Sequence, residues 1–168
     1  QIKGDSRVVS ASISGYVPAG NSYNNNFFLY DTDVAAQVKT VRYQVDPEYI
    51  PTLGMEISEG RNFNKSMATD SNAIILNETA AKAFGWGKDA IGKNLKSNYN
   101  NGEKISYQVI GVVKDFHFRS LHEPISPLVM TIGDNTGGIL VKISATDIPG
   151  ILHQLKERWS AFGLETSF

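Results

Sequence analysis

The sequence predicts an α+β fold, and three observations lead to this class. Short stretches of alternating or continuous apolar residues indicate β-strands along most of the 168-residue chain. Three helical segments interrupt the strands without alternating strictly with them, which argues against a repeated strand–helix–strand fold. Hydrophobic residues make up 41% of the sequence and charged residues 20%, so the chain has enough apolar side chains to bury a core.

The first elements are expected to be strands separated by a long loop. Residues 7–13 alternate apolar residues with serines, which predicts a half-buried strand. Its apolar side carries Val9, Ala11 and Ile13. Residues 15–26 are rich in asparagine and contain proline and glycine, so we expect an exposed loop there. Strands over residues 27–30 and 38–45 follow.

The middle of the chain combines two helices with one short strand. A helix is predicted over residues 48–53, because a proline precedes it and a glycine follows it. Residues 55–63 show no regular pattern, so we expect an irregular segment. Residues 73–76 form a continuous apolar run that predicts a buried strand. Asn77 is a favourable N-cap for a second helix over residues 78–84.

A hairpin is expected in the second half of the chain. Residues 95–99 and 105–113 are the predicted strands, and the Asn-Gly dipeptide at 101–102 is a strong turn signal between them. The alternation of the second strand changes phase near Gly111, which predicts a β-bulge there.

Two further strands and a helix complete the predicted fold. The strands cover residues 128–132 and 139–143. Asp147 is placed to cap the last helix. Apolar residues spaced by three and four predict which side of this helix is buried: Ile148, Ile151, Leu152, Leu155, Trp159 and Phe162.

Composition excludes several classes of function. The net charge of −1 provides no basic excess for binding nucleic acid. The absence of cysteine excludes disulfides, thiolate metal sites and cysteine nucleophiles. No apolar run reaches the roughly 20 residues that span a bilayer. Because the chain begins with Gln1 and ends with Phe168, we expect an excised domain of a longer protein. The core-forming composition and the amphipathic last helix predict that the isolated domain folds by itself as a monomer.

The candidate functional segment is residues 114–123, where charged, aromatic and imidazole side chains follow an apolar strand directly. We expect it to form a structured corner between strands that transmits motion or contacts a partner. Its two phenylalanines alternate, so their rings are predicted to pack under the segment, while its charged residues fix its path. The candidate interaction or corner residues are Lys114, Asp115, Phe116, His117, Phe118 and Arg119.

Other candidate sites are weaker. Residues 87–94 nearly match a phosphate-binding loop, but Asn94 replaces the required Ser or Thr, so no nucleotide site is expected. The side chains of Asp115, His117, His122 and Glu123 lie in one loop, yet they do not form a complete metal-ligand pattern. No serine lies in a Gly-x-Ser-x-Gly motif. We therefore assign no catalytic residue, no metal ligand and no cofactor.

Several motifs resemble one known family. Residues 108–121 are the most specific match, and residues 53–63 are similar to a family segment that ends in Gly-Arg-x-Phe. The strand and helix at 73–85 also fit, and Asp-Ala-Ile-Gly-Lys at 89–93 resembles the family's Asp-Pro-Ile-Gly-Lys. These motifs resemble the MacB-like periplasmic core domain of FtsX-type ABC transporter permeases, in Bacteroidetes-like forms. The resemblance covers about residues 38–162.

The resemblance implies a two-lobed extracytoplasmic domain over residues 1–168, with a βαβ-type lobe formed by both chain ends and a mostly β inserted lobe. The implied lobes are residues 1–53 with 125–168, and residues 54–124. The domain would lie on the periplasmic side of the bacterial inner membrane, beside transmembrane helices of the same permease. The implied partners are a cytoplasmic ABC ATPase, acting indirectly, and a periplasmic partner protein.

The expected function is non-enzymatic. The domain would transmit conformational change, or engage substrate or periplasmic partners, during export. The alternative is a ligand-binding sensor module of a membrane protein, which a large apolar cleft would favour. A hydrolase is a third alternative, which Ser, His and Asp side chains gathered in a pocket would favour.

Overall fold

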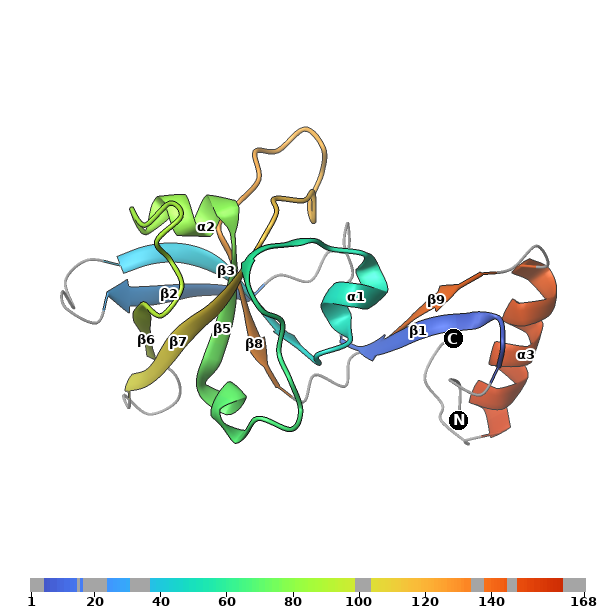
Figure 1. The fold of residues 1–168 in the computed structure, drawn as a ribbon. Coiled ribbons are helices and arrows are strands. Elements are labelled where there is room, and N and C mark those ends of the chain that lie inside the picture. The colour runs from blue at the N-terminus through green and yellow to red at the C-terminus, as the bar shows by residue number, and fades with distance from the viewer. Residues whose placement is uncertain are drawn as a thin grey trace.

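A closed sheet carrying a smaller two-stranded sheet forms the framework of the protein (Figure 1). The computed structural model describes residues 5–14, 16, 24–30, 37–98, 104–133, 138–144 and 148–161. Within these residues the larger sheet has the strand order β4-β7-β5-β8-β3-β2-β6, and the smaller one consists of β1 and β9. The mixture of sheets with few helices confirms the α+β class.

The elements agree closely with the predicted ones. The strands are β1 (Val8–Ile13), β2 (Asn24–Tyr30), β3 (Gln37–Val45), β4 (Ile57–Gly60), β5 (Ala73–Asn77), β6 (Asn94–Asn98), β7 (Lys104–Val113), β8 (Leu128–Ile132) and β9 (Ile139–Ile143). The helices are α1 (Tyr49–Leu53), the 3₁₀ helix η2 (Ala68–Asn72), α2 (Glu78–Ala83) and α3 (Ile148–Ala161).

The larger sheet closes on itself because β6 pairs with two strands. It is antiparallel to β2 on one side and to the first half of β7 on the other. The second half of β7 pairs with β4 instead, while β5 is its parallel neighbour. The result is a six-stranded barrel in which β4 extends the wall beside β7.

Every residue of β5 is buried because apolar side chains cover both of its faces. Ile74 and Leu76 belong to one core cluster, together with Phe28 and residues of α2. Ile75 belongs to a second cluster that includes Tyr43 and side chains of α1. The continuous apolar run in the sequence therefore reflects a strand with no solvent side.

The predicted bulge near Gly111 is confirmed. The register between β5 and β7 shifts so that Ile75 faces Gly111, and Ile110 is the extra residue. The Ile110 carbonyl then accepts a hydrogen bond from the Arg61 N–H at 2.9 Å. A Cβ at position 111 would lie 2.4 Å from the Arg61 carbonyl oxygen, so this crossing of two backbones requires glycine.

Two local predictions differ from the structure. β2 begins at Asn24, so the expected loop ends earlier; residue 15 and residues 17–23 of that loop lie outside the described residues. β4 occurs within residues 55–63, which were expected to be irregular, because the end of β7 supplies its hydrogen-bonding partner. The turn at residues 99–103, Asp147 and Phe162 also lie outside the described residues.

The half-buried strand near the N-terminus is confirmed, but its buried side is the serine side. Ser12 and Ser14 are fully buried, whereas Val9 and Ile13 are 59% and 50% exposed. The reason is a polar contact with the chain before α1, where the Ser12 hydroxyl donates to the Asp46 carboxylate at 2.6 Å.

The final helix is present, and its apolar side is only partly covered. Ile151 is fully buried. Ile148 and Leu152 are exposed, and Trp159 is half-buried. The three-and-four spacing therefore identified the helix correctly, but it overstated how much of the apolar side is packed.

Strand pairing does not follow the lobe limits implied by the resemblance. β5 belongs to the implied lobe of residues 54–124, and it pairs with β8, which belongs to the implied lobe of residues 1–53 and 125–168. β8 pairs in turn with β3 of that same lobe. A single sheet thus includes strands of both expected lobes. The division of the chain into these two lobes, whose limits were approximate, stays a prediction.

Candidate functional site

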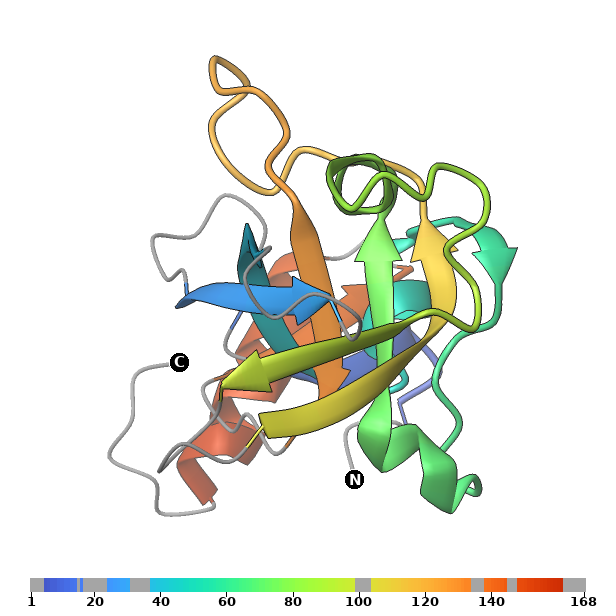
Figure 2. The same ribbon diagram turned by 90° about the vertical axis from the view of Figure 1, so that its left-hand side faces the viewer.

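The candidate segment belongs to the connection between β7 and β8, residues 114–127, which we call the β7–β8 loop. β5 lies between β7 and β8 in the sheet, so the chain must cross the end of β5, where α2 begins. Figure 2 shows this loop leaving β7, passing α2 and projecting beyond the sheet before it enters β8.

The first two residues of the loop are attached to neighbouring elements. The Lys114 N–H donates to the Glu56 carbonyl at 2.9 Å, and its ammonium lies 2.7 Å from the Glu56 carboxylate. The Asp115 carboxylate accepts hydrogen bonds from the Thr79 N–H at 2.9 Å and the Thr79 hydroxyl at 2.8 Å. Asp115 therefore satisfies an N–H in the first turn of α2 that has no partner within the helix.

The far end of the loop is attached to the same place by Asn77. Its side-chain oxygen accepts from the Ala80 N–H at 2.9 Å, which confirms the predicted helix cap. The same oxygen accepts from the Leu128 N–H at 2.8 Å, and the side-chain amide donates to the Ser126 carbonyl at 3.1 Å. Both ends of the β7–β8 loop are thus hydrogen-bonded to the start of α2.

Aromatic side chains anchor the middle of the loop. Phe118 is 1% exposed and meets the Tyr43 ring edge-on, with 5.8 Å between the ring centroids. Phe116 is half-buried, and its ring centroid lies 5.5 Å from that of Phe118. His117 is exposed. The predicted packing of both rings under the segment is therefore confirmed.

The tip of the loop is a hydrogen-bonded turn. The Glu123 N–H donates to the Ser120 carbonyl at 3.0 Å, and the His122 N–H donates to the Ser120 hydroxyl at 3.3 Å. Arg119 lies 3.9 Å from the Glu123 carboxylate. Leu121, within the turn, is 77% exposed. Charged side chains therefore contact both the segment and its neighbours, and the expected role of these residues as an interaction or corner site stays a prediction.

A shallow hollow lies in the same loop. Its empty volume is about 150 Å³ including open solvent, well below the roughly 300–1,000 Å³ of typical small-molecule sites. His117, Ser120 and Glu123 are among its lining residues, but the structure joins their side chains by no described hydrogen bond. The geometry of a catalytic triad is therefore not formed here.

The other sequence candidates gain no geometry that supports them. In the described part of the chain, no group of three or more His, Asp or Glu side chains is arranged to hold a metal ion. The near phosphate loop at 87–94 follows α2 and leads into β6, so it lacks the strand before it and the helix after it that such a loop requires.

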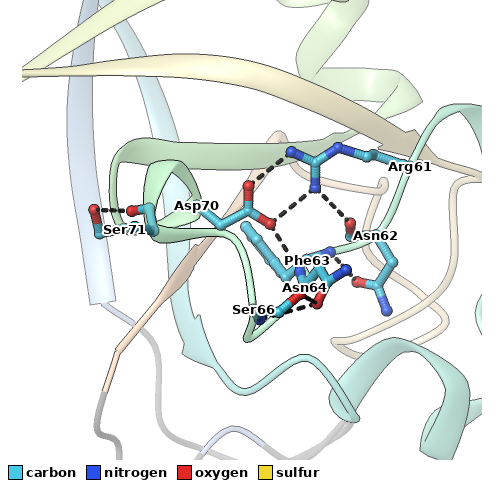
Figure 3. A network of polar contacts seen from close by, with 8 residues as sticks. Arg61, Asn62, Phe63, Asn64, Ser66, Asp70 and Ser71 are labelled. Atoms are coloured by element: carbon cyan, nitrogen blue, oxygen red, sulfur yellow. Dashed lines mark hydrogen bonds and ion pairs between the residues drawn. The ribbon is translucent and has the colours of Figure 1, made fainter.

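A polar cluster that sequence reasoning did not assign lies after β4 (Figure 3). Arg61 donates to both carboxylate oxygens of Asp70, at 2.7 and 2.8 Å. Asp70 also accepts from the Asn64 N–H at 2.8 Å. The hydrogen bonds from Arg61 are the main reason that the pKa of Asp70 lies below its ordinary value. The Gly-Arg-x-Phe motif was the available signal, but its acidic partner could not be identified from spacing.

Comparison with known proteins identifies the family. The family model described as the MacB-like periplasmic core domain matches residues 2–157. A search of curated proteins found no significant match. None of the described helices has the length and apolar composition needed to span a bilayer.

Solved structures show the same fold. The periplasmic region of MacB from Actinobacillus actinomycetemcomitans is 18% identical, with a TM-score of 0.69 over 96% of this chain and 70% of that chain. The extracellular domain of the ABC-type transporter YknZ from Gram-positive bacteria is 16% identical, with a TM-score of 0.61 over 93% of this chain and 73% of that one.

A domain of a protein named as a permease from Porphyromonas gingivalis is 13% identical, with a TM-score of 0.65 over 95% of this chain and 72% of that one. Because the family model covers most of the sequence, the family follows directly. The chain belongs to the MacB-like periplasmic core domains.

Proposed function

We propose that this domain is a non-enzymatic coupling element of its permease, and that the β7–β8 loop either transmits conformational change or engages a partner during export. The transmembrane helices of the same permease would move the domain, and the cytoplasmic ABC ATPase would drive that motion indirectly. The family membership supports the transporter context.

The observation that carries the proposal is the number of elements that the loop joins. Lys114 contacts the segment before β4, Asp115 contacts α2, and Phe118 packs against β3. A displacement of any of these elements would be passed to the loop, because packed and hydrogen-bonded groups move together. The loop is therefore suited to transmit a mechanical change to the exposed surface at its tip.

The features of the described residues favour coupling over the two alternatives. A sensor module would need an enclosed apolar pocket, whereas the hollow in the β7–β8 loop is shallow and open. A hydrolase would need a hydrogen-bonded nucleophile and base, whereas the Ser120 hydroxyl accepts from a backbone N–H. Neither alternative has a specific observation that supports it.

The test uses the full permease in a strain that lacks its own copy. Asp115→Ala and Arg119→Ala are compared with Asp89→Ala, which removes an exposed carboxylate outside the loop. We expect Asp115→Ala to impair the export-dependent phenotype, because it releases the loop from α2. The melting temperature of each purified variant separates a coupling defect from unfolding.

Two outcomes decide between the readings. Impaired export with a melting temperature close to that of the wild type would support coupling through the loop. Normal export by both loop variants would leave the loop as local scaffolding and would refute this function for it.

A further inference from the structure

β1, β9 and α3 form a group beside the barrel that we call the small unit (Figure 1). Among the described strands, β1 and β9 pair only with each other. The Arg7 guanidinium, just before β1, donates to the side chain of Gln154 in α3. The first and the last of the described elements therefore belong to one unit. A force that acts on the chain before β1 or after α3 reaches the small unit before it reaches the barrel.

The small unit is attached to the end of β3 by three polar contacts, which we call the joint. The Ser12 hydroxyl donates to the Asp46 carboxylate at 2.6 Å, and the Ile13 N–H donates to the other oxygen of that carboxylate at 3.2 Å. The Ser14 hydroxyl donates to the Gln44 carbonyl at 3.3 Å. Because Gln44 and Asp46 are two positions apart, the contacts act on one short piece of backbone, just before α1.

The polar character of the joint allows it to open. A small and polar contact between two units of one chain permits relative motion, whereas a large apolar one holds them together. β1 turns its serine side to the joint and leaves Val9 and Ile13 59% and 50% exposed. When the joint opens, its groups exchange their hydrogen bonds for bonds to water, so the net cost is modest.

A row of aromatic rings connects the joint to the β7–β8 loop. Tyr16, which follows β1, is buried and stacks on Tyr43 with 4.4 Å between the ring centroids. The Tyr49 hydroxyl of α1 donates to the Tyr16 carbonyl at 2.8 Å. Tyr43 directly precedes the joint in β3 and also meets Phe118 edge-on. A displacement at the end of β3 is therefore passed through Tyr43 to the ring that anchors the loop.

We infer that the small unit pivots at the end of β3, with the Asp46 carboxylate as the latch of this hinge. In the closed position Asp46 holds Ser12 and Ile13, as in this structure. In the open position these groups are hydrated, while Tyr16 and Leu140 keep their apolar contacts with the barrel core and act as the pivot.

This inference goes beyond the role proposed for the β7–β8 loop. It assigns the step by which motion that enters at the chain ends reaches β3. It rests on the proposed function only for what the loop then does with that motion.

The first experiment is native-state hydrogen exchange of the 168-residue chain with Ser12→Ala. This change removes one bond to Asp46 and leaves the Ile13 N–H bonded to the same carboxylate. We expect exchange of the Ile13 amide to become roughly tenfold faster, because the loss of a hydrogen bond to a carboxylate shifts the opening equilibrium by about that factor.

Two other amides show whether the opening is a pivot. The Ser14 N–H donates to the Gly138 carbonyl within the small unit, and the Val41 N–H donates to the Pro127 carbonyl in the barrel. Both should keep their exchange rates, because neither bond crosses the joint.

Ser71→Ala is the matched control, since the Ser71 hydroxyl also donates one hydrogen bond but lies outside the joint. It should change none of the three rates. An equal acceleration of the Ser14 amide would mean that β1 frays instead of pivoting. An unchanged Ile13 rate, or an equal acceleration of the Val41 amide, would mean that the joint opens only with the whole fold. Each of these results would overturn the inference.

The second experiment locks the joint in the full permease. This chain has no cysteine, so Ser12→Cys combined with Asp46→Cys introduces one pair into it, and all other cysteines of the permease are removed. The two side chains touch in the closed position, so oxidation should join them. We expect loss of export on oxidation and recovery on reduction of the same protein. Each single variant is the control and should respond to neither treatment. Equal export by the oxidised and reduced forms of the double variant would overturn the inference.

The failures of the two proposals can be distinguished. If Asp115→Ala impairs export while the oxidised double variant exports normally, the loop couples motion and the pivot is refuted. If oxidation blocks export while Asp115→Ala does not, the pivot stands and the function proposed for the loop is refuted.

Discussion

The carboxylate of Asp70 provides a quantitative test of how the segment after β4 is held. Its side chain is 2% exposed and receives two hydrogen bonds from Arg61 and one from the Asn64 N–H. Asp70→Asn keeps the shape but removes the charge and turns one acceptor into a donor that faces the guanidinium. Breaking a buried ion pair costs about 3–5 kcal/mol. Because Arg61 is 41% exposed, solvent screens the pair. We therefore expect Asp70→Asn to lower the free energy of unfolding by about 2–3 kcal/mol.

The pH dependence of this loss follows from the direction of the pKa shift. The hydrogen bonds from Arg61 lower the pKa of Asp70 in the folded protein below its unfolded value, which is about 4. The folded state therefore binds a proton less readily than the unfolded chain does. The stabilisation is complete above the unfolded pKa and is lost as the pH falls through the lower folded pKa. The difference between wild type and Asp70→Asn should thus be constant near neutral pH and shrink below about pH 4.

Urea denaturation at pH 7 and at acidic pH measures the free energy of unfolding that Asp70→Asn removes and how that difference depends on pH. Asp89→Asn is the control, because it makes the same change of charge at an exposed position. Its effect should stay within about 0.5 kcal/mol. The reasoning would be refuted if Asp70→Asn lowered the free energy of unfolding by less than about 0.5 kcal/mol, or if the decrease did not change on acidification.

Four further predictions concern packing, ligands and assembly. Gly111→Ala should destabilise the fold by more than about 1 kcal/mol, because its Cβ would lie 2.4 Å from the Arg61 carbonyl oxygen; an unchanged urea midpoint would contradict the crossing of the two backbones. Ile151→Ala should lower the free energy of unfolding by about 2–5 kcal/mol, because Ile151 is fully buried. Trp159→Ala should cost less than the roughly 3–5 kcal/mol of a buried ring, because Trp159 is only half-buried. Equal stability losses for the two variants in thermal unfolding would show that α3 is packed differently. Calorimetry with Mg-ATP and with zinc should give no stoichiometric heat, and sedimentation should show a monomer at micromolar concentration; a micromolar site or a stable dimer would overturn these expectations.

Much of the fold follows from local patterns. The continuous apolar run of β5 and the Asn77 cap of α2 were predicted within a residue of their observed limits. The phase change at Gly111 correctly marked the bulge in β7. These features were predictable because strand alternation, helix capping and bulges are properties of a few consecutive residues.

The candidate site was only partly predictable. Alternation along the segment placed Phe116 and Phe118 on one side and His117 on the other, as observed. The sequence did not indicate that Asp115 would bond to Thr79, 36 positions earlier. Nor did it indicate that Asn77 would hold the end of the loop as well as its own helix. Both contacts depend on β5 lying between β7 and β8, which is a property of strand order.

The sequence by itself determined the α+β class, most of the strands and helices, and the resemblance to the permease family. Tertiary structure alone decided that β1 buries its serines and that β4 is a strand. It also decided that Arg61 pairs with Asp70 and that both ends of the β7–β8 loop meet at α2. The physical reason is that periodicity reports which residues share a side of an element, whereas the partner that covers that side is fixed by how distant elements pack.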